Sequence, residues 1–195
     1  MPQLKIAVLG SGKGSNFRAI LSAIMAGHLR VTPVLAASDV ADAGILTLAD
    51  NLGIPTTVIH EPKYRTRLST EVESGLVEQL QSSGADLIIL AGYMRLVKAP
   101  LLEAFPRRII NIHPSLLPAF PGLEAWKQAL SAGVKTTGCT VHFVDSGMDT
   151  GEIIAQSEVQ VLPGDTAETL HARIQDAEHR LFPEVIARFA RREFF

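Results

Sequence analysis

The chain has 195 residues, of which 47% are hydrophobic and 19% charged, and its net charge is −2. A chain of this length buries roughly 70% of its unfolded surface, so it folds without help from a disulfide or a metal. The composition excludes a disordered protein, and the absence of a dense Lys/Arg stretch argues against nucleic acid as the main partner. The single cysteine, Cys139, fits a reducing compartment, and no apolar stretch reaches the ~18 residues of a membrane span. We therefore expect a cytoplasmic protein that does not bind a membrane.

The first two-thirds of the chain alternates between strand and helix patterns. Short apolar runs predict strands, and apolar residues at a 3.6-residue period predict helices. In chain order these are strand Leu4–Leu9, helix Phe17–Ala26, strand Val31–Ala37, helix Ala43–Asn51, strand Thr56–Ile59, helix Leu68–Ser82, strand Leu87–Leu90, helix Ala99–Phe105 and strand Arg108–His113. Strands joined by helices of this length predict a parallel sheet that is covered on both faces.

The pattern changes after Pro118. The elements predicted there are helix Leu123–Ala132, strands Thr137–Val144 and Ile153–Val161, and a long helix from about Thr166 to Arg191, capped by Asp165 or Thr166. Cys139 lies within one of these strands, and we interpret it as a core residue rather than a nucleophile. No repeat, linker or break in composition divides the chain, so a single domain is expected.

A glycine-rich loop, residues 10–16 (GSGKGSN), joins the first strand to the first helix. Glycines allow a ligand to approach the backbone, and the free N–H groups at a helix start attract anions. The dinucleotide fingerprint GxGxxG does not fit, because its third glycine falls at Ser15, and the lysine comes too early for GxxxxGK[ST]. The loop predicts a general phosphate-binding cradle, and a turn without a ligand is the alternative.

Three segments follow strands that are expected to be parallel: the glycine loop, Gly92–Arg95 and Asn111–Pro114. Ligands of open α/β sheets bind at this edge. Asn111 and His113 lie two residues apart on one strand, so both side chains leave the same face, while Ile112 points into the core. An amide beside an imidazole suits an oxygen that gains negative charge during acyl transfer.

The remaining polar candidates are less specific. The other five histidines, His142 among them, have no comparable setting and no zinc-like spacing, so no metal is expected. Asp149 lies in a turn with two glycines and a second aspartate, and it is either a turn former or a catalytic carboxylate. A carboxylate near His113 would raise the pKa of that imidazole and favour the imidazolium.

The segment Asn111–Pro118 (NIHPSLLP), followed by Phe120–Leu123 (FPGL), resembles the signature of folate-dependent formyltransferases. The resemblance continues in order through residues 12–16, 91–95, 138–144, 149–151 and 175–179. It implies a three-layer α/β fold with a mostly parallel twisted sheet, helices on both faces and a Rossmann-like N-terminal half. It also implies one formyltransferase domain, residues 1–195, in which residues 1–100 bind the nucleotide phosphate and residues 101–195 carry catalysis and folate binding.

The activity that this resemblance implies is a formyl transfer in de novo purine biosynthesis. The amine of glycinamide ribonucleotide attacks the formyl carbon of 10-formyltetrahydrofolate, which serves as a co-substrate, and no metal takes part. The expected partners are these small molecules, neither nucleic acid nor membrane, and the expected state is a monomer or homodimer.

The resemblance also implies residue roles. His113 acts as the proton donor, Asp149 holds it protonated, and Asn111 steadies the formyl oxygen. The substrate phosphate and ribose contacts are Gly14, Ser15, Asn16, Gln175 and Glu178. The folate contacts are Arg67, with Arg65 as the alternative, Met94, Arg95, Leu96, Val97, Asn111, Asp145, Ser146, Gly147, Met148 and Asp149.

Three rival functions stay open at this point. A hydrolase of 10-formyltetrahydrofolate is similar but usually carries an additional N-terminal regulatory domain. Methionyl-tRNA formyltransferase usually adds a C-terminal domain and has an arginine where this chain has Pro121. A non-catalytic nucleotide sensor would explain the glycine loop but would leave Asn111, His113 and Asp149 without a purpose.

Overall fold

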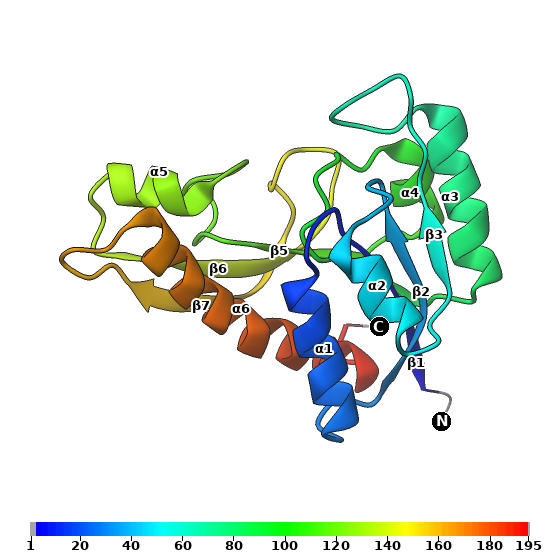
Figure 1. Ribbon diagram of the computed structural model, residues 1–195, viewed down its shortest axis with the longest axis horizontal. Coiled ribbons are helices and arrows are strands. Elements are labelled where there is room, and N and C mark those ends of the chain that lie inside the picture. The colour runs from blue at the N-terminus through cyan, green and yellow to red at the C-terminus, as the bar shows by residue number, and fades with distance from the viewer. Residues whose placement is uncertain (1–2, 195) are drawn as a thin grey trace.

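The computed structural model describes residues 3–194, which fold around a seven-stranded sheet with the order β3-β2-β1-β4-β5-β6-β7 (Figure 1). The strands are β1 (Leu4–Leu9), β2 (Val31–Ser38), β3 (Thr56–Val58), β4 (Leu87–Leu90), β5 (Ile109–His113), β6 (Thr136–Phe143) and β7 (Ile153–Gln160). The helices are α1 (Ser15–Met25), α2 (Gly44–Asp50), α3 (Thr70–Ser82), α4 (Ala99–Ala104), α5 (Ala125–Ser131) and α6 (Ala167–Ala190).

The sheet is parallel from β1 to β5 and antiparallel beyond. β1 pairs with β2 and β4, and β4 pairs with β5, all in the parallel sense. β6 runs antiparallel to both β5 and β7. The predicted mostly parallel α/β fold is thus confirmed, and the change of pattern after Pro118 marks the switch to antiparallel pairing.

Helices cover both faces of the sheet because successive strand residues point to opposite sides. In β1, Ile6 and Val8 join a core with residues of α1, α2 and α6, whereas Ala7 and Leu9 join a core with residues of α3 and α4. Figure 1 shows α1 and α6 lying side by side on the first of these faces, and α3 and α4 at the other side of the fold. The three predicted layers are present.

One helix boundary differs because a side chain holds the preceding segment. The periodic pattern predicts a helix from Leu68, but α3 begins at Thr70. Leu68 is buried as the pattern requires, yet the Ser69 N–H donates to the Glu61 carboxylate at 2.5 Å and the backbone there is extended. Apolar periodicity therefore located the core contact but not the helix start.

Left-handed residues set two other helix starts. Gly14, at φ 76°, precedes α1, which begins at Ser15, two residues earlier than predicted. Glu124, at φ 54°, precedes α5, which begins two residues later than predicted. For α6 the cap is Thr166, whose side chain accepts from the N–H three residues on.

Two further expectations concern burial and membranes. Cys139 is fully buried in the first core, and burial raises the pKa of its thiol to about 12, so the interpretation as a core residue is confirmed. Within residues 3–194, no helix is long and apolar enough to cross a membrane.

Candidate active site

The three segments singled out in the sequence meet at one edge of the sheet. β1, β4 and β5 are neighbours in the strand order, so the loops that follow them lie together at their carboxyl ends. The Ser11 N–H donates to the Gly92 carbonyl at 3.0 Å, which joins the first loop directly to the second. The predicted convergence is confirmed.

β5 presents Asn111 and His113 on one face, and Ile112 is buried in the core on the other. Because β6 pairs antiparallel with β5, His142 lies opposite Asn111 and Thr140 opposite His113. Setting His142 aside with the other histidines was therefore wrong. The sequence does offer an indication of its role. Thr140 and His142 are two residues apart on one strand, as Asn111 and His113 are, so their side chains also share a face.

Asp149 reaches this cluster from the loop after β6. Its Oδ2 lies 3.3 Å from His113 Nδ1 and accepts from the Gly122 N–H at 2.8 Å, and its Oδ1 lies 3.7 Å from His142 Nε2. Asp149 adopts φ 55°, a left-handed conformation that aspartate tolerates better than most residues. Of the two interpretations left open, a turn former alone does not explain a carboxylate aimed at two imidazoles.

A glycine allows the Asp149 loop to pass close to β6. A side chain at Gly151 would overlap the Phe143 carbonyl, and it would also reach within 3.5 Å of the His142 ring. The sequence Asp149-Thr150-Gly151 thus combines a left-handed turn with a close backbone approach.

Burial and contacts act in opposite directions on the two central ionisable groups. Burial raises the pKa of Asp149, but the contacts to His142, Gly122 and His113 outweigh it, so the pKa is lowered overall. Burial lowers the pKa of His113, and the Phe120 carbonyl and Asp149 only partly offset it. The expectation of a raised His113 pKa was wrong, although Asp149 acts in the expected direction. The missing quantity was the burial of the ring, which is 4% exposed.

The proline-rich turn after β5 fixes the other side of His113. Its Nε2–H donates to the Phe120 carbonyl at 2.9 Å, because a carbonyl can only accept. The turn is held by the Ser115 hydroxyl, which donates to the Ala119 carbonyl, and by Thr140, which donates to the Ser115 carbonyl. Both ring nitrogens of His113 therefore face acceptors, an arrangement that the imidazolium satisfies fully and the neutral ring does not.

His142 orients the Asn111 amide. The His142 Nδ1–H donates to the Phe143 carbonyl at 2.8 Å, so in the neutral ring Nε2 is an acceptor. Asn111 Nδ2 lies 3.2 Å from that Nε2 and donates to it. One N–H of the amide is thereby fixed, and the other is left for an oxygen in front of β5.

The residues expected at the substrate phosphate gather where α1 meets α6. Gly14 ends the loop in a left-handed conformation and packs against Ile45, and no side chain caps the N-terminus of α1. The Asn16 amide donates to the Glu178 carboxylate at 2.9 Å, which joins residues 162 positions apart. Burial raises the pKa of Glu178 to about 7. Ser15 begins α1, and Gln175 lies about one turn before Glu178 on α6.

The residues expected at the folate are placed less uniformly. Met94 and Met148 are more than half exposed, whereas Val97 is buried in the second core and has no side chain left for a ligand. Leu96 forms a backbone bridge with Arg67, which places Arg67 rather than Arg65 beside this segment.

The loop from Asp145 to Thr150 is organised by its first carboxylate. Asp145 accepts from the Gly147 N–H at 3.0 Å and from the Thr150 hydroxyl at 2.8 Å. Asp145, Ser146 and Gly147 are all exposed, so this loop lies open beside Asp149.

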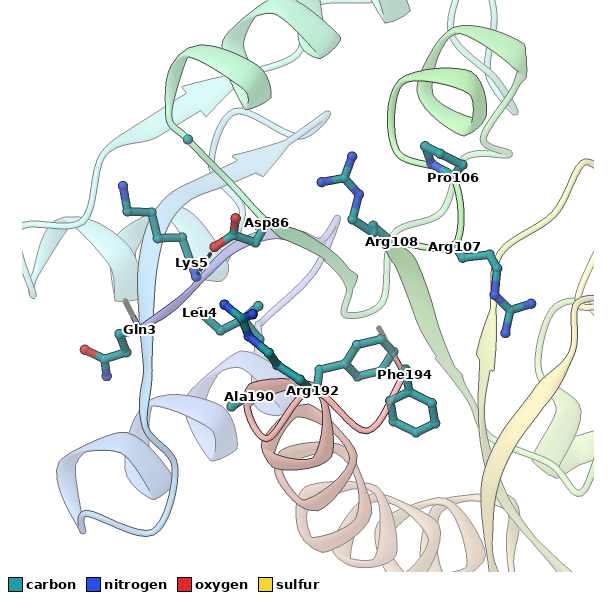
Figure 2. A pocket seen from close by; sticks show the side chains of 12 residues that line it. Gln3, Leu4, Lys5, Asp86, Pro106, Arg107, Arg108, Ala190, Arg192 and Phe194 are labelled. Atoms are coloured by element: carbon teal, nitrogen blue, oxygen red, sulfur yellow. Dashed lines mark hydrogen bonds between the residues drawn. The ribbon is translucent and has the colours of Figure 1, made fainter. Parts of the chain in front are cut away.

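A further cavity lies at the opposite edge of the sheet. It has a volume of about 670 Å³ and is lined by residues before β1, β4 and β5 and after α6. Figure 2 shows Arg107, Arg108 and Arg192 around it, with guanidinium groups that point in different directions. Arg107 already pairs with Glu152 at 2.7 Å. This cavity lacks convergent polar groups, and no group of His, Cys, Asp and Glu within residues 3–194 could hold a metal ion.

Comparison with known proteins gives consistent matches. A family model described as Formyl transferase matches residues 4–186. The chain is 44% identical over 182 residues to phosphoribosylglycinamide formyltransferase of Bacillus subtilis (strain 168), covering 93% of this chain and 92% of that protein. It is 46% identical to the trifunctional purine biosynthetic protein adenosine-3 of Drosophila pseudoobscura pseudoobscura, covering 97% of this chain but 14% of that longer protein. The crystal structure of glycinamide ribonucleotide transformylase 1 from Symbiobacterium toebii is similar with a TM-score of 0.92 and 51% identity, covering 97% of this chain and 88% of that one.

Proposed function

The chain belongs to the formyl transferase family, and on this premise we propose how its residues carry out the transfer. It moves the formyl group of 10-formyltetrahydrofolate to the amine of glycinamide ribonucleotide, N1-(5-phospho-D-ribosyl)glycinamide, in de novo purine biosynthesis. The formyl donor is a co-substrate. We assign the chemistry of the transfer to Asn111, His113 and Asp149.

The first step forms the new C–N bond. The amine attacks the formyl carbon, and the formyl oxygen becomes negative in the tetrahedral intermediate. The free N–H of Asn111 and an N–H of His113 donate to that oxygen. The oxygen thereby replaces one of the two acceptors that the His113 ring otherwise contacts. A well-placed donor of this kind contributes about 3 kcal/mol to stabilising the transition state. The developing negative charge also favours the protonated ring and so opposes the effect of burial on the His113 pKa.

The second step breaks the bond between the formyl carbon and the folate nitrogen. Asp149, ionised at neutral pH because its pKa is lowered, takes the proton that the amine loses, directly or through water. The oxyanion then re-forms the carbonyl bond as the bond to the folate nitrogen breaks. The leaving nitrogen receives the proton that Asp149 took up, passed on through the His113 ring that Asp149 contacts or through water. The products are the formylated amine and tetrahydrofolate. His142 acts on the reaction through Asn111, whose amide it orients.

The observation that carries this assignment is the convergence of three polar side chains from separate segments. Asn111 and His113 come from β5 and Asp149 from the loop after β6, and Asp149 lies 3.3 Å from His113. A carboxylate that touches an imidazole beside an amide is the arrangement that the proton transfers above require.

We also propose which residues around this centre bind each substrate. The phosphate and ribose of the acceptor bind Gly14, Ser15, Asn16, Gln175 and Glu178. The folate binds Arg67, Met94, residues 95–97 through their backbone, and residues 145–149 with Asn111. The chain then forms one formyltransferase domain over residues 1–195, in which residues 1–100 supply most of the phosphate site and residues 101–195 the catalytic groups. The Asn16–Glu178 hydrogen bond means that the phosphate site draws on both halves. We propose that the protein works in the cytoplasm as a monomer or homodimer.

The test is an absorbance assay of tetrahydrofolate formation from 10-formyltetrahydrofolate, with and without glycinamide ribonucleotide. Product formation that requires the amine supports the transferase. Formate released at a full catalytic rate without any amine would instead support the hydrolase, and tight nucleotide binding with no transfer would support a sensor.

A further inference from the structure

Asp39, which directly follows β2, lies outside every set of residues assigned above. Its carboxylate is nearly inaccessible, with a side chain 8% exposed, and it forms an ion pair with Arg95 at 2.7 Å between Oδ2 and Nε. Its other oxygen, Oδ1, accepts from the Ser11 hydroxyl at 2.5 Å. A buried charge is retained at a cost unless it is fully paired, and here each oxygen has its own partner.

These partners come from segments that lead to two different proposed substrate sites. Ser11 is part of the glycine loop that runs into the proposed phosphate site. Arg95 is part of the segment that we propose binds the folate. The Ser11 hydroxyl, besides donating to Asp39, accepts from the Met94 N–H at 3.0 Å. The carboxylate and the hydroxyl thus form a continuous chain of hydrogen bonds from one loop to the other.

Arg95 extends the chain of contacts to a third segment. Its Nη1 donates to the backbone carbonyls of Tyr64 at 2.5 Å and of Arg67 at 3.1 Å. Arg67 in turn stacks its guanidinium on the Tyr64 ring at 4.2 Å. The Arg95 side chain is 11% exposed and therefore acts as a tie between loops rather than as a free cation.

We propose that Asp39 is a positioning residue that couples the two substrate sites, so that binding of the nucleotide favours binding of the folate and the reverse. This inference rests on the proposed placement of the two substrates. A ligand that orders residues 10–16 also orders Ser11, and through Asp39 it orders Met94 and Arg95 before the second ligand arrives. The first ligand to bind then carries the entropic cost of ordering these loops, so the second ligand binds more tightly. The affinities of the two ligands are therefore coupled reciprocally.

The experiment measures this coupling without chemistry. The dissociation constant of glycinamide ribonucleotide is determined by calorimetry with and without saturating tetrahydrofolate, which has no formyl group to transfer. In the unsubstituted protein, we expect tetrahydrofolate to tighten nucleotide binding by about fivefold or more. Asp39→Asn keeps the shape of the side chain but removes its charge. In this variant, tetrahydrofolate should change the dissociation constant of the nucleotide by less than about twofold.

Two further variants make the result specific. Asp42→Asn removes the same charge from an exposed side chain that, within residues 3–194, makes no hydrogen bond or ion pair, and the coupling should persist. Ser11→Ala removes the hydroxyl that bonds both Asp39 and Met94 and leaves the Asp39–Arg95 ion pair in place. It should also lower the coupling, so the test stands even if Asp39→Asn folds poorly.

The possible outcomes distinguish a failure of the role of Asp39 from a failure of the proposed function. Coupling that survives in both Asp39→Asn and Ser11→Ala overturns the role of Asp39 while the proposed function stands. Coupling lost equally in Asp42→Asn also overturns it, because any charge change would then suffice. Failure of the unsubstituted protein to bind the nucleotide would overturn the proposed function and this inference with it.

Discussion

Polar side chains gather at both ends of the central strands, but they are arranged in opposite ways at the two ends. At the amino ends of β1, β4 and β5, Arg107, Arg108 and Arg192 surround a cavity and spread apart (Figure 2). At the carboxyl ends of the same strands, Asn111 and His113 lie on one face of β5, and Asp149 contacts His113. Convergence and burial of polar groups, more than the presence or charge of a cavity, therefore mark the reactive edge.

The largest loss of activity is expected when either member of the ionisable pair is removed. We expect His113→Ala and Asp149→Ala to lower kcat by a factor on the order of 10³, because proton donation and uptake both fail. Steady-state assays at saturating substrate measure the loss, and circular dichroism checks that the fold persists. Asp149→Asn, which keeps the shape without the charge, should lose nearly as much. Turnover near the original rate in any of these would remove that residue from the mechanism.

Removing the neutral donor should have the next largest effect. Asn111→Ala is expected to lower kcat by roughly 10²-fold, because one donor to the developing oxyanion is lost while KM changes little. Asn111→Asp is the matched variant, and its negative charge facing the oxyanion should make it no better than alanine. A change confined to KM would show that Asn111 only binds substrate.

The buried carboxylate of Glu178 gives the reactive edge a pH-dependent stability. Its pKa of about 7 in the folded protein exceeds the ordinary glutamate pKa of 4.5, so the folded state holds more protons between these values. Stability should therefore fall as pH rises from about 4.5 to 7, by an amount on the order of 3 kcal/mol, and then level off. Glu178→Gln should flatten this profile in urea unfolding at pH 5 and 8, whereas the exposed Glu184→Gln on the same helix should leave it in place. An unchanged profile in Glu178→Gln would contradict the assignment.

The smallest effect is expected at the opposite edge. Arg108→Ala and Arg192→Ala should leave kcat/KM within about twofold of the original value, because neither guanidinium lies at the reactive edge and surface substitutions of this kind change little. A loss of tenfold or more in the same transfer assay would show that the cavity shown in Figure 2 takes part in the reaction, and the contrast between the two edges would not hold.

The order of strands and helices followed from local pattern, and the errors lie where tertiary contacts override it. The strand Leu87–Leu90 was predicted at its observed bounds because a buried parallel strand is an uninterrupted apolar run. The start of α3 was misplaced because the Glu61 carboxylate, eight residues upstream, holds the Ser69 N–H. His142 was missed because its place at the site depends on which strand pairs with β5 and in which register.

The fold class, the placement of Asn111 and His113 on one strand face, and the resemblance to formyltransferases follow from the sequence, because each depends on local patterns or on the order of motifs. The approach of Asp149 and His142 to that pair, the link that Asp39 makes between the loops after β1 and β4, and the lowering of the His113 pKa by burial are visible only in the folded chain. Long-range approach and desolvation depend on how distant segments pack, and a linear pattern does not encode either quantity locally.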